Sequence, residues 1–233
     1  MTQSKFISEL GLLGIEINEI QLSQLEKYYE LLVEYNKVMN LTGITEKEDV
    51  YLKHFYDSIS IIKAIDLNKI NTLCDMGTGA GFPGMVLAII YPNLKVTLVD
   101  SINKRINFLN EVIKELDLKN VETKHDRIEE YSKKNKEKFD VVTARAVAQT
   151  NVLLEICSQS IKIGGYFIAM KGNIDSENDY NNALRVLDFN EDKIIKFKLP
   201  IENSDRSLLR FKKQKSTNKL FPRKYSEIKK KPL

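Results

Sequence analysis

The sequence predicts an α/β fold: a doubly wound parallel sheet that ends in an antiparallel hairpin. Three observations predict it. Strands and helices alternate from residue 72 onward, a glycine-rich loop joins the first strand to the first helix, and two further strands close the sheet. We expect parallel strands at 72–76, 95–99, 121–125, 139–144 and 164–170, helices between them at 83–91, 104–116, 127–133, 149–161 and 176–187, and hairpin strands at 193–198 and 207–211.

The part of the chain before this alternating region is expected to be helical. Apolar residues recur at helical spacing from Leu22 to Met39, so this segment should lay an apolar stripe on the main domain. After a loop at 40–43, residues 45–48 fit a capping box that opens a short helix. We therefore expect an N-terminal helical extension (1–66), a main domain (67–212) and a basic C-terminal tail (213–233) that packs near the active site.

Length and composition favour one main domain with extensions. A chain of 233 residues with 42% hydrophobic content can bury one full core. Neither a signal peptide nor a long apolar run is visible, so we expect a cytoplasmic protein with no membrane contact. Cys74 and Cys157 have no metal-ligand or disulfide spacing, and we expect both to pack in the core.

Positive charge is concentrated at the C-terminus. From Phe211 onward there are nine Lys or Arg residues and one acid, Glu227, a balance of +8; the first 210 residues hold 27 basic and 31 acidic side chains, a balance of −4. Such a segment favours a polyanionic partner. The apolar and aromatic residues among these charges offer base stacking or docking on the domain. Because the charged tail should bury little surface, we expect it to add RNA affinity rather than stability.

The glycine-rich loop indicates a nucleotide cofactor. Residues 77–84 hold four of the ten glycines, and Gly79-x-Gly81-x-x-Gly84 matches the dinucleotide pattern, which alone is a weak signal. Asp75 would repel a pyrophosphate at the following helix N-terminus but suits a cationic amino group and sulfonium, as in S-adenosylmethionine (SAM). Asp100, at the end of the next strand, can accept the ribose hydroxyls of either nucleotide cofactor or cap the following helix. The closing hairpin is typical of the class I SAM-dependent methyltransferase fold.

The segment after the fourth strand narrows the range of possible methyl acceptors. Residues 143–148 contain no Asn/Asp-Pro-Pro-aromatic tetrad for amino groups of bases, and no cysteine is placed for pyrimidine C5 methylation. What remains is an acceptor that is already nucleophilic, such as guanine N7. Arg145 could hold guanine O6 or a phosphate, or form a structural ion pair. His54, Asp57 and Ser58 lack a nucleophile elbow, so we interpret their helix as packing, with Asp57 or Ser58 as a cap.

Several motifs together resemble the RsmG family, also called GidB, over nearly the whole chain. The motifs are Asn40-Leu41-Thr42, His54-Phe55-Tyr56-Asp57-Ser58, the run from Asp75 to Gly84, Asp100-Ser101 with Lys104-Arg105, Ala144-Arg145-Ala146, Met170-Lys171-Gly172 and Phe221-Pro222-Arg223-Lys224. The resemblance implies a class I methyltransferase that uses SAM, releases S-adenosylhomocysteine, needs no metal and forms 7-methylguanosine at guanosine 527 of 16S ribosomal RNA. The implied partner is that RNA or the small ribosomal subunit, and we expect a monomer.

The resemblance also implies roles for individual residues. One group would bind the cofactor: Asp75 with the loop residues Gly77, Thr78, Gly79, Gly81 and Phe82 at the methionine part, Asp100 at the ribose, Arg127, Ile128 and Glu129 at the adenine, and the active-site arginine, Arg145. A second group would surround the RNA target: Asn40, His54, Lys171, Arg206, Pro222 and Arg223. One departure is visible, because Gly43 stands where the family usually has an alanine.

Three other functions remain open on the sequence. A nicotinamide-dependent oxidoreductase could use the same sheet, although Asp75 and the hairpin argue against it. A binding module could hold SAM as a sensor and only grip RNA. A SAM-dependent methyltransferase could act on another RNA, or on a small molecule or a protein; the basic aromatic tail disfavours the last two.

Overall fold

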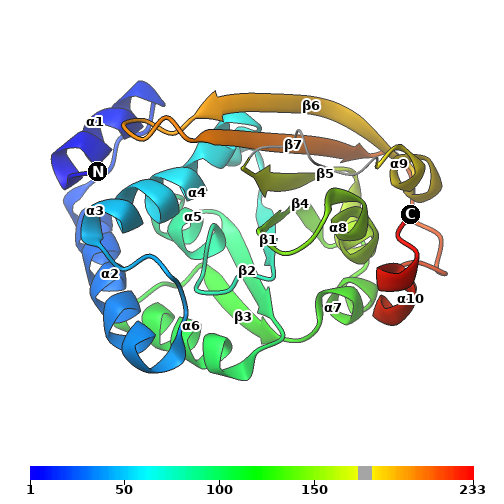
Figure 1. Cartoon of the computed structure of the whole chain (residues 1–233), viewed down its shortest axis with the longest axis horizontal. Helices are drawn as coiled ribbons and strands as arrows, with labels where there is room; N and C mark the ends of the chain where they lie inside the picture. The colour runs from blue at the N-terminus through cyan, green and yellow to red at the C-terminus, as the bar shows by residue number, and fades with distance from the viewer. Residues whose placement is uncertain (173–179) are drawn as a thin grey trace.

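A seven-stranded mixed sheet forms the centre of the computed structural model, which describes residues 1–172 and 180–233 (Figure 1). The strand order is β3-β2-β1-β4-β5-β7-β6, with β7 antiparallel to both neighbours. The strands are β1 (Thr72–Met76), β2 (Lys95–Asp100), β3 (Val121–His125), β4 (Phe139–Arg145), β5 (Ile161–Lys171), β6 (Phe189–Lys198) and β7 (Asp205–Lys213). The predicted doubly wound sheet with a closing hairpin is confirmed.

Helices cover both faces of this sheet. The helices of the described chain are α1 (Gln3–Leu12), α2 (Glu19–Met39), α3 (Lys47–Asp49), α4 (Asp57–Ile59), α5 (Gly84–Ile90), α6 (Asn103–Glu115), α7 (Ile128–Lys134), α8 (Thr150–Cys157), α9 (Asn181–Leu187) and α10 (Tyr225–Lys230), with short π or 3₁₀ segments η1 (Val50–Tyr56), η2 (Ser60–Lys63), η3 (Leu67–Lys69) and η4 (Ser158–Ser160). None of these helices is both long and apolar enough to cross a membrane. The helix expected at 176–187 starts among residues that the structure does not describe, and its described part contains α9.

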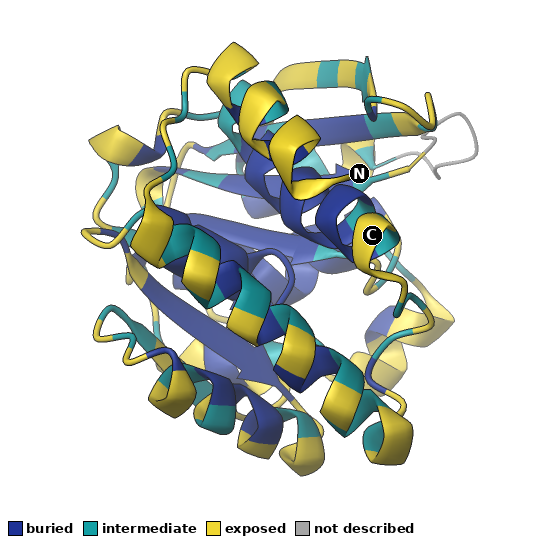
Figure 2. Ribbon diagram, turned by 90° about the vertical axis from the view of Figure 1, so that its left-hand side faces the viewer, coloured by how far each residue is buried: buried dark blue, intermediate teal, exposed yellow. Residues whose placement is uncertain are grey.

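Side chains that alternate along each strand fill two cores. Leu73, Val141 and Ile168 point to the core shared with α5, α6 and the N-terminal extension, whereas Cys74 and Val142 point to the core under α8 and α9. Both cysteines are buried, as expected. Figure 2 shows the inner strands and the inward helix faces buried, with exposed residues on the outward helix faces; the outer strand β6 is mostly exposed.

The N-terminal extension is joined to the main domain by polar contacts as well as by this core. Helix α2 places Gln21 so that its amide donates to Ile89 O (3.1 Å) and Ile90 O (3.0 Å), and Gln24 donates to Leu116 O (2.9 Å). These carbonyls lie at the ends of α5 and α6, where intrahelical donors are lacking. The extension therefore completes two helices of the main domain.

The helical segment after the first loop differs from the expected one. Helix α3 has Glu46 as its N-cap, with no side-chain capping bond, so the capping box predicted at 45–48 is wrong. The segment continues through η1, a π-helical stretch, and α4 to the end of η2 at Lys63. Asp57 therefore lies inside a continuous helical segment and caps nothing, and π-helical turns are frequent at functional sites.

The C-terminal tail is docked on the domain. Lys213, Pro222 and Ile228 are buried, and Lys213 Nζ donates to Ser158 O (2.8 Å) and Ile161 O (2.9 Å). The Arg223 guanidinium forms two bonds with the buried carboxylate of Glu155, at 2.8 and 2.6 Å, and its backbone N–H donates a third at 3.0 Å. The expectation that the tail buries little is wrong, because a buried acid on α8 neutralises one of its cations.

Candidate active site

The loop after β1 is organised by the buried carboxylate of Asp75. Its Oδ2 accepts from Thr78 Oγ1 (2.7 Å) and from the backbone N–H of Gly84 (2.9 Å). Its Oδ1 is buried and has no hydrogen-bond partner among the described residues. Burial raises the pKa of Asp75 to about 6, while the bonds from Thr78 and Gly84 oppose that rise. The side chain thus presents one unused acceptor inside the loop.

Two glycines of this loop are required by its geometry. A Cβ on Gly84 would overlap Leu98 and lie 2.9 Å from the Cβ of Asp75. Gly79 has a left-handed backbone (φ 62°), and a Cβ there would meet nothing within 4 Å. The space beside Gly79 is therefore open to a ligand.

Asp100 connects this loop to the ends of β2 and β3. Its Oδ2 accepts from the Gly79 N–H (2.9 Å) and Arg105 Nη1 (3.2 Å), and its Oδ1 accepts from Ile102 N (2.9 Å). The N-cap of α6 is Ile102, so Asp100 does not cap that helix. The Asp100 carbonyl accepts from the N–H of Asp126 (3.2 Å), just before the segment expected to hold adenine. Hydrogen bonds thus join the loop to Asp100 and, through it, to the segment expected to hold adenine.

These three segments fit SAM. The unpaired Oδ1 of Asp75 suits an amino group, the open side of Gly79 leaves room for the ligand, and Asp100 offers carboxylate oxygens. Ile128, in the segment expected to hold adenine, lies against Gly77, as does Val147 from the loop after β4. Arg127 Nε donates to Glu129 (2.6 Å).

Arg145, at the end of β4, is held by residues of the N-terminal extension. Its Nη1 donates to Asp57 Oδ2 (2.8 Å) and to the Lys53 carbonyl (3.1 Å), and its Nη2 lies 3.2 Å from His54 Nδ1. The guanidinium also lies 5.3 Å from the centre of the Phe82 ring. The structural ion pair left open by the sequence is therefore present, and it is formed with Asp57.

His54 is a neutral acceptor for Arg145. Its ring stacks on Phe82 (4.3 Å between centroids), and Nε2 lies 2.9 Å from Thr42 Oγ1. Because arginine only donates, Nδ1 must accept and Nε2 carries the proton. Burial, followed by the positive charge of Arg145, lowers the pKa of His54 to about 3. The ring is uncharged at neutral pH.

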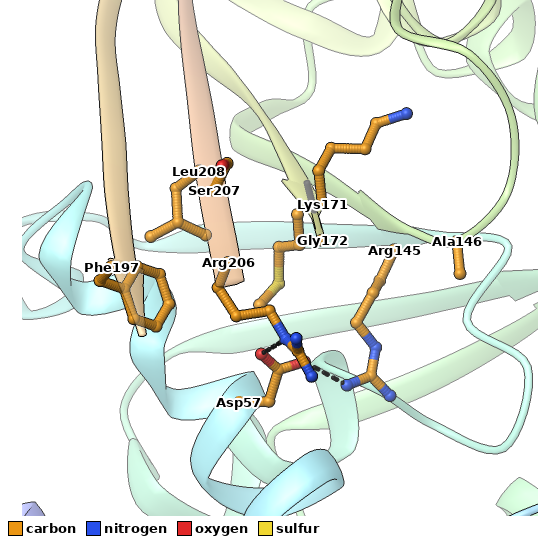
Figure 3. Close-up of a pocket in the computed structure, with 10 residues that line it drawn as sticks. Asp57, Arg145, Ala146, Lys171, Gly172, Phe197, Arg206, Ser207 and Leu208 are labelled. Atoms are coloured by element: carbon orange, nitrogen blue, oxygen red, sulfur yellow. Dashed lines mark hydrogen bonds and ion pairs between the residues drawn. The ribbon is translucent and has the colours of Figure 1, made fainter. Parts of the chain in front are cut away.

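A pocket of about 160 Å³ opens beside these residues (Figure 3). It is lined by Asp57, Arg145, Ala146, Met170, Lys171, Gly172, Phe197, Arg206, Ser207 and Leu208. Figure 3 shows the Asp57 carboxylate between the guanidinium groups of Arg206 and Arg145. No residue from Gly77 to Gly84 lines the pocket, so it lies outside the cofactor loop.

The structure brings together only part of the residue set expected to surround the target. Arg145, Lys171 and Arg206 line the pocket, and His54 contacts Arg145 behind it. Asn40, which ends α2 in a left-handed conformation, is exposed and does not line it, and neither do Pro222 and Arg223.

The sequence does not reveal the role of Asp57 at the site. It is interpreted there as a cap, although its place three residues after His54, on one helix face, is a usable signal. The C-terminal tail contacts the segment expected to hold adenine through Tyr225, whose ring lies 5.1 Å from the Arg127 guanidinium.

Solved structures with the same architecture identify the fold class of the chain. A SAM-dependent methyltransferase from Aquifex aeolicus has a TM-score of 0.52 and 16% identity, covering 71% of this chain and 93% of that one. A precorrin-6y C5,15-methyltransferase from Geobacter metallireducens has a TM-score of 0.51 and 12% identity, covering 76% and 92%. The fold is the class I methyltransferase fold.

Sequence comparison identifies the family. Residues 21–206 match the GidB family model, rRNA small subunit methyltransferase G. Proteins named ribosomal RNA small subunit methyltransferase G are similar to the whole chain: one from Lysinibacillus sphaericus is 48% identical over 237 residues (100% of both chains), and one from Lachnoclostridium phytofermentans is 49% identical over 234 (99% and 97%). The chain belongs to the GidB family and is a methyltransferase, which confirms the resemblance seen in the sequence.

Proposed function

We propose that this methyltransferase transfers a methyl group from SAM to N7 of guanosine 527 in 16S ribosomal RNA. Its family and its relatives' names support the RNA substrate. The observation that carries the proposal is the meeting of Arg145 and Arg206 at one pocket that Lys171 also lines, with the Arg145 guanidinium 5.3 Å from the ring centre of the loop residue Phe82. Cationic donors of this kind suit the O6 and N7 edge of guanine and the flanking phosphates. We propose a cytoplasmic monomer that acts on this RNA or the small subunit.

The proposed cofactor contacts follow the fit described above. Asp75 would accept from the amino group of SAM, Asp100 from its ribose hydroxyls, and residues 127–129 would lie against its adenine. When bound, SAM supplies an electrophilic methyl group on its sulfonium. Phe82, itself a residue of the loop, stacks on His54 and so joins the loop to the N-terminal extension.

The proposed transfer is a direct in-line displacement. Guanine N7 has a lone pair and no proton, so alignment and fixed dipoles lower the barrier without proton removal. His54 is neutral and its Nδ1 faces a donor, which is consistent with a reaction that needs no base there.

The decisive experiment is to map 7-methylguanosine in 16S ribosomal RNA from cells with and without this protein, together with transfer of labelled methyl by the purified protein. Loss of the modification at position 527 alone supports the proposal. Unchanged modification, with transfer to another RNA or a small molecule, would favour the alternative acceptors.

Asp100→Ala is expected to weaken SAM binding about a hundredfold, about 3 kcal/mol, because hydrogen bonds to a charged acceptor are lost. Calorimetry measures the dissociation constant. Glu111→Ala, on the exposed face of α6, is the control, and equal affinities in the two variants would remove Asp100 from the cofactor site.

SAM affinity is expected to fall at acidic pH. The raised pKa of Asp75, about 6, means that its carboxylate is ionised above pH 6 and protonated below it. Because the ionised form attracts an amino group, the dissociation constant should rise toward tenfold per pH unit below about 6. Calorimetry between pH 5 and 8 measures this slope, and Asp75→Asn should remove it. A slope that survives in Asp75→Asn would assign it to another group.

The rate of methyl transfer on bound RNA is expected to be nearly flat between about pH 7 and 9 at saturating SAM. A general base with a pKa in this range would impose a slope, and the proposed acceptor needs none. Single-turnover kinetics provides the test. A unit slope that disappears in His54→Gln would show that His54 is a base and that the acceptor is not N7.

A further inference from the structure

Asp57 forms ion pairs with two arginines from different strands. Its Oδ2 accepts from Arg145 Nη1 of β4 at 2.8 Å, and its Oδ1 accepts from Arg206 Nε of β7 at 2.9 Å. The Asp57 side chain is 7% exposed, so solvent screens these contacts little. Without it, two guanidinium groups would face each other across a small pocket and repel.

We infer that Asp57 is a positioning residue for methyl transfer, an inference that rests on the proposed function. It fixes the guanidinium groups of Arg145 and Arg206 at two sides of the pocket, so that both present their remaining N–H groups to one nucleotide. Asp57 acts through the arginines, because each carboxylate oxygen already faces a guanidinium.

Both arginines keep N–H groups that form no hydrogen bond to Asp57 and can face a nucleotide. A guanidinium has five N–H groups. Arg145 uses N–H groups toward Asp57, the Lys53 carbonyl and His54. Arg206 uses Nε toward Asp57 and Nη1 toward Ser204 and Asp205. Within the described part of the chain, no hydrogen bond occupies Arg206 Nη2, so each arginine keeps donors for the O6 of a base or a phosphate.

The helical segment that carries Asp57 also supplies the other contacts of Arg145. Asp57 belongs to α4, directly after the π-helical turn, and Ser60 Oγ donates to the Asp57 carbonyl. Lys53 and His54, one turn earlier, supply the other two contacts of Arg145. A single helical segment of the extension therefore sets the geometry of an arginine on the central sheet.

The first test replaces Asp57 by asparagine, which has nearly the same shape but no charge. We expect the single-turnover rate at saturating RNA and SAM to fall by about ten- to a hundredfold, because misplacement by 1 Å costs rates of this size. SAM affinity should stay within about twofold, since the carboxylate lies outside the cofactor loop. Asp57→Glu keeps the charge and should recover part of the rate.

Asp140→Asn is the matched control. Asp140 lies at the opposite end of β4, where its carboxylate pairs with Lys162 (2.6 Å) and accepts from Thr72. Its loss should lower stability without lowering the transfer rate. Equal rates in Asp57→Asn and the wild type, or equal rate losses in Asp57→Asn and Asp140→Asn, would overturn the inference.

A second measurement is made on the wild type and does not depend on activity, and variants serve only to assign its signals. Arginine side-chain ¹⁵N NMR of the wild type should show slow guanidinium rotation for Arg145 and Arg206 but fast rotation for the exposed Arg185, with assignments from single Arg→Lys variants. Fast rotation at both pocket arginines would overturn the inference. A wild type that leaves 16S ribosomal RNA unmodified would instead overturn the proposed function, and the NMR result would still decide the role of Asp57.

Discussion

Glu155→Ala is expected to lower the free energy of unfolding by about 3 to 5 kcal/mol. Glu155 is fully buried on α8 and accepts three hydrogen bonds from Arg223, so its removal leaves the tail cation unpaired. For a chain of this size each kcal/mol corresponds to about 2–4 °C, which gives a fall of about 10 °C in melting temperature. Thermal unfolding followed by circular dichroism measures the change.

The control for this prediction is Glu130→Ala. Glu130 is an exposed acid on α7 that pairs with Lys133 at 3.6 Å, and surface ion pairs contribute little. We expect a change below about 0.5 kcal/mol there. Equal melting temperatures of Glu155→Ala and Glu130→Ala would mean that the tail does not stabilise the domain. Its cations would then contribute to RNA binding only.

Arg145→Lys is expected to lower the rate of methyl transfer by about a hundredfold while sparing SAM binding. Lysine keeps the positive charge but cannot donate at once to Asp57, Lys53 O and His54 from one planar group. The orientation of the target base would then be lost, and alignment is the main source of rate in this proposal. Single-turnover transfer to the small subunit measures the rate, and calorimetry measures SAM affinity.

Arg185→Lys, at an exposed position on α9, is the matched control for the same chemical change. It should leave the rate unchanged. A rate equal to wild type in Arg145→Lys would show that charge alone is sufficient at this position. Loss of SAM binding would instead place Arg145 at the cofactor, as the resemblance also implies.

The parallel strands and the cofactor loop could be predicted from sequence because their signals are local. Buried parallel strands are short apolar runs, and the loop residues from Asp75 to Gly84 carry geometric requirements that the structure shows at Gly79 and Gly84. The outer strand β6 was harder to predict. It begins at Phe189, four residues before the expected start, because its first half is exposed and charged and thus has no apolar pattern. Strand β5 likewise begins at Ile161, three residues before the expected start.

The sheet, the loop and the family motifs can be recognised in the sequence, whereas the pairing of the charges depends on how the whole chain folds. Asp57 meets Arg145 and Arg206 across 88 and 149 residues, and Arg223 meets Glu155 across 68. The periodicity of a sequence does not predict such long-range pairs, because whether two side chains meet depends on where the sheet places the elements that carry them. The same two charges can be a solvated surface in one arrangement and a buried ion pair in another, and burial determines how strongly they interact.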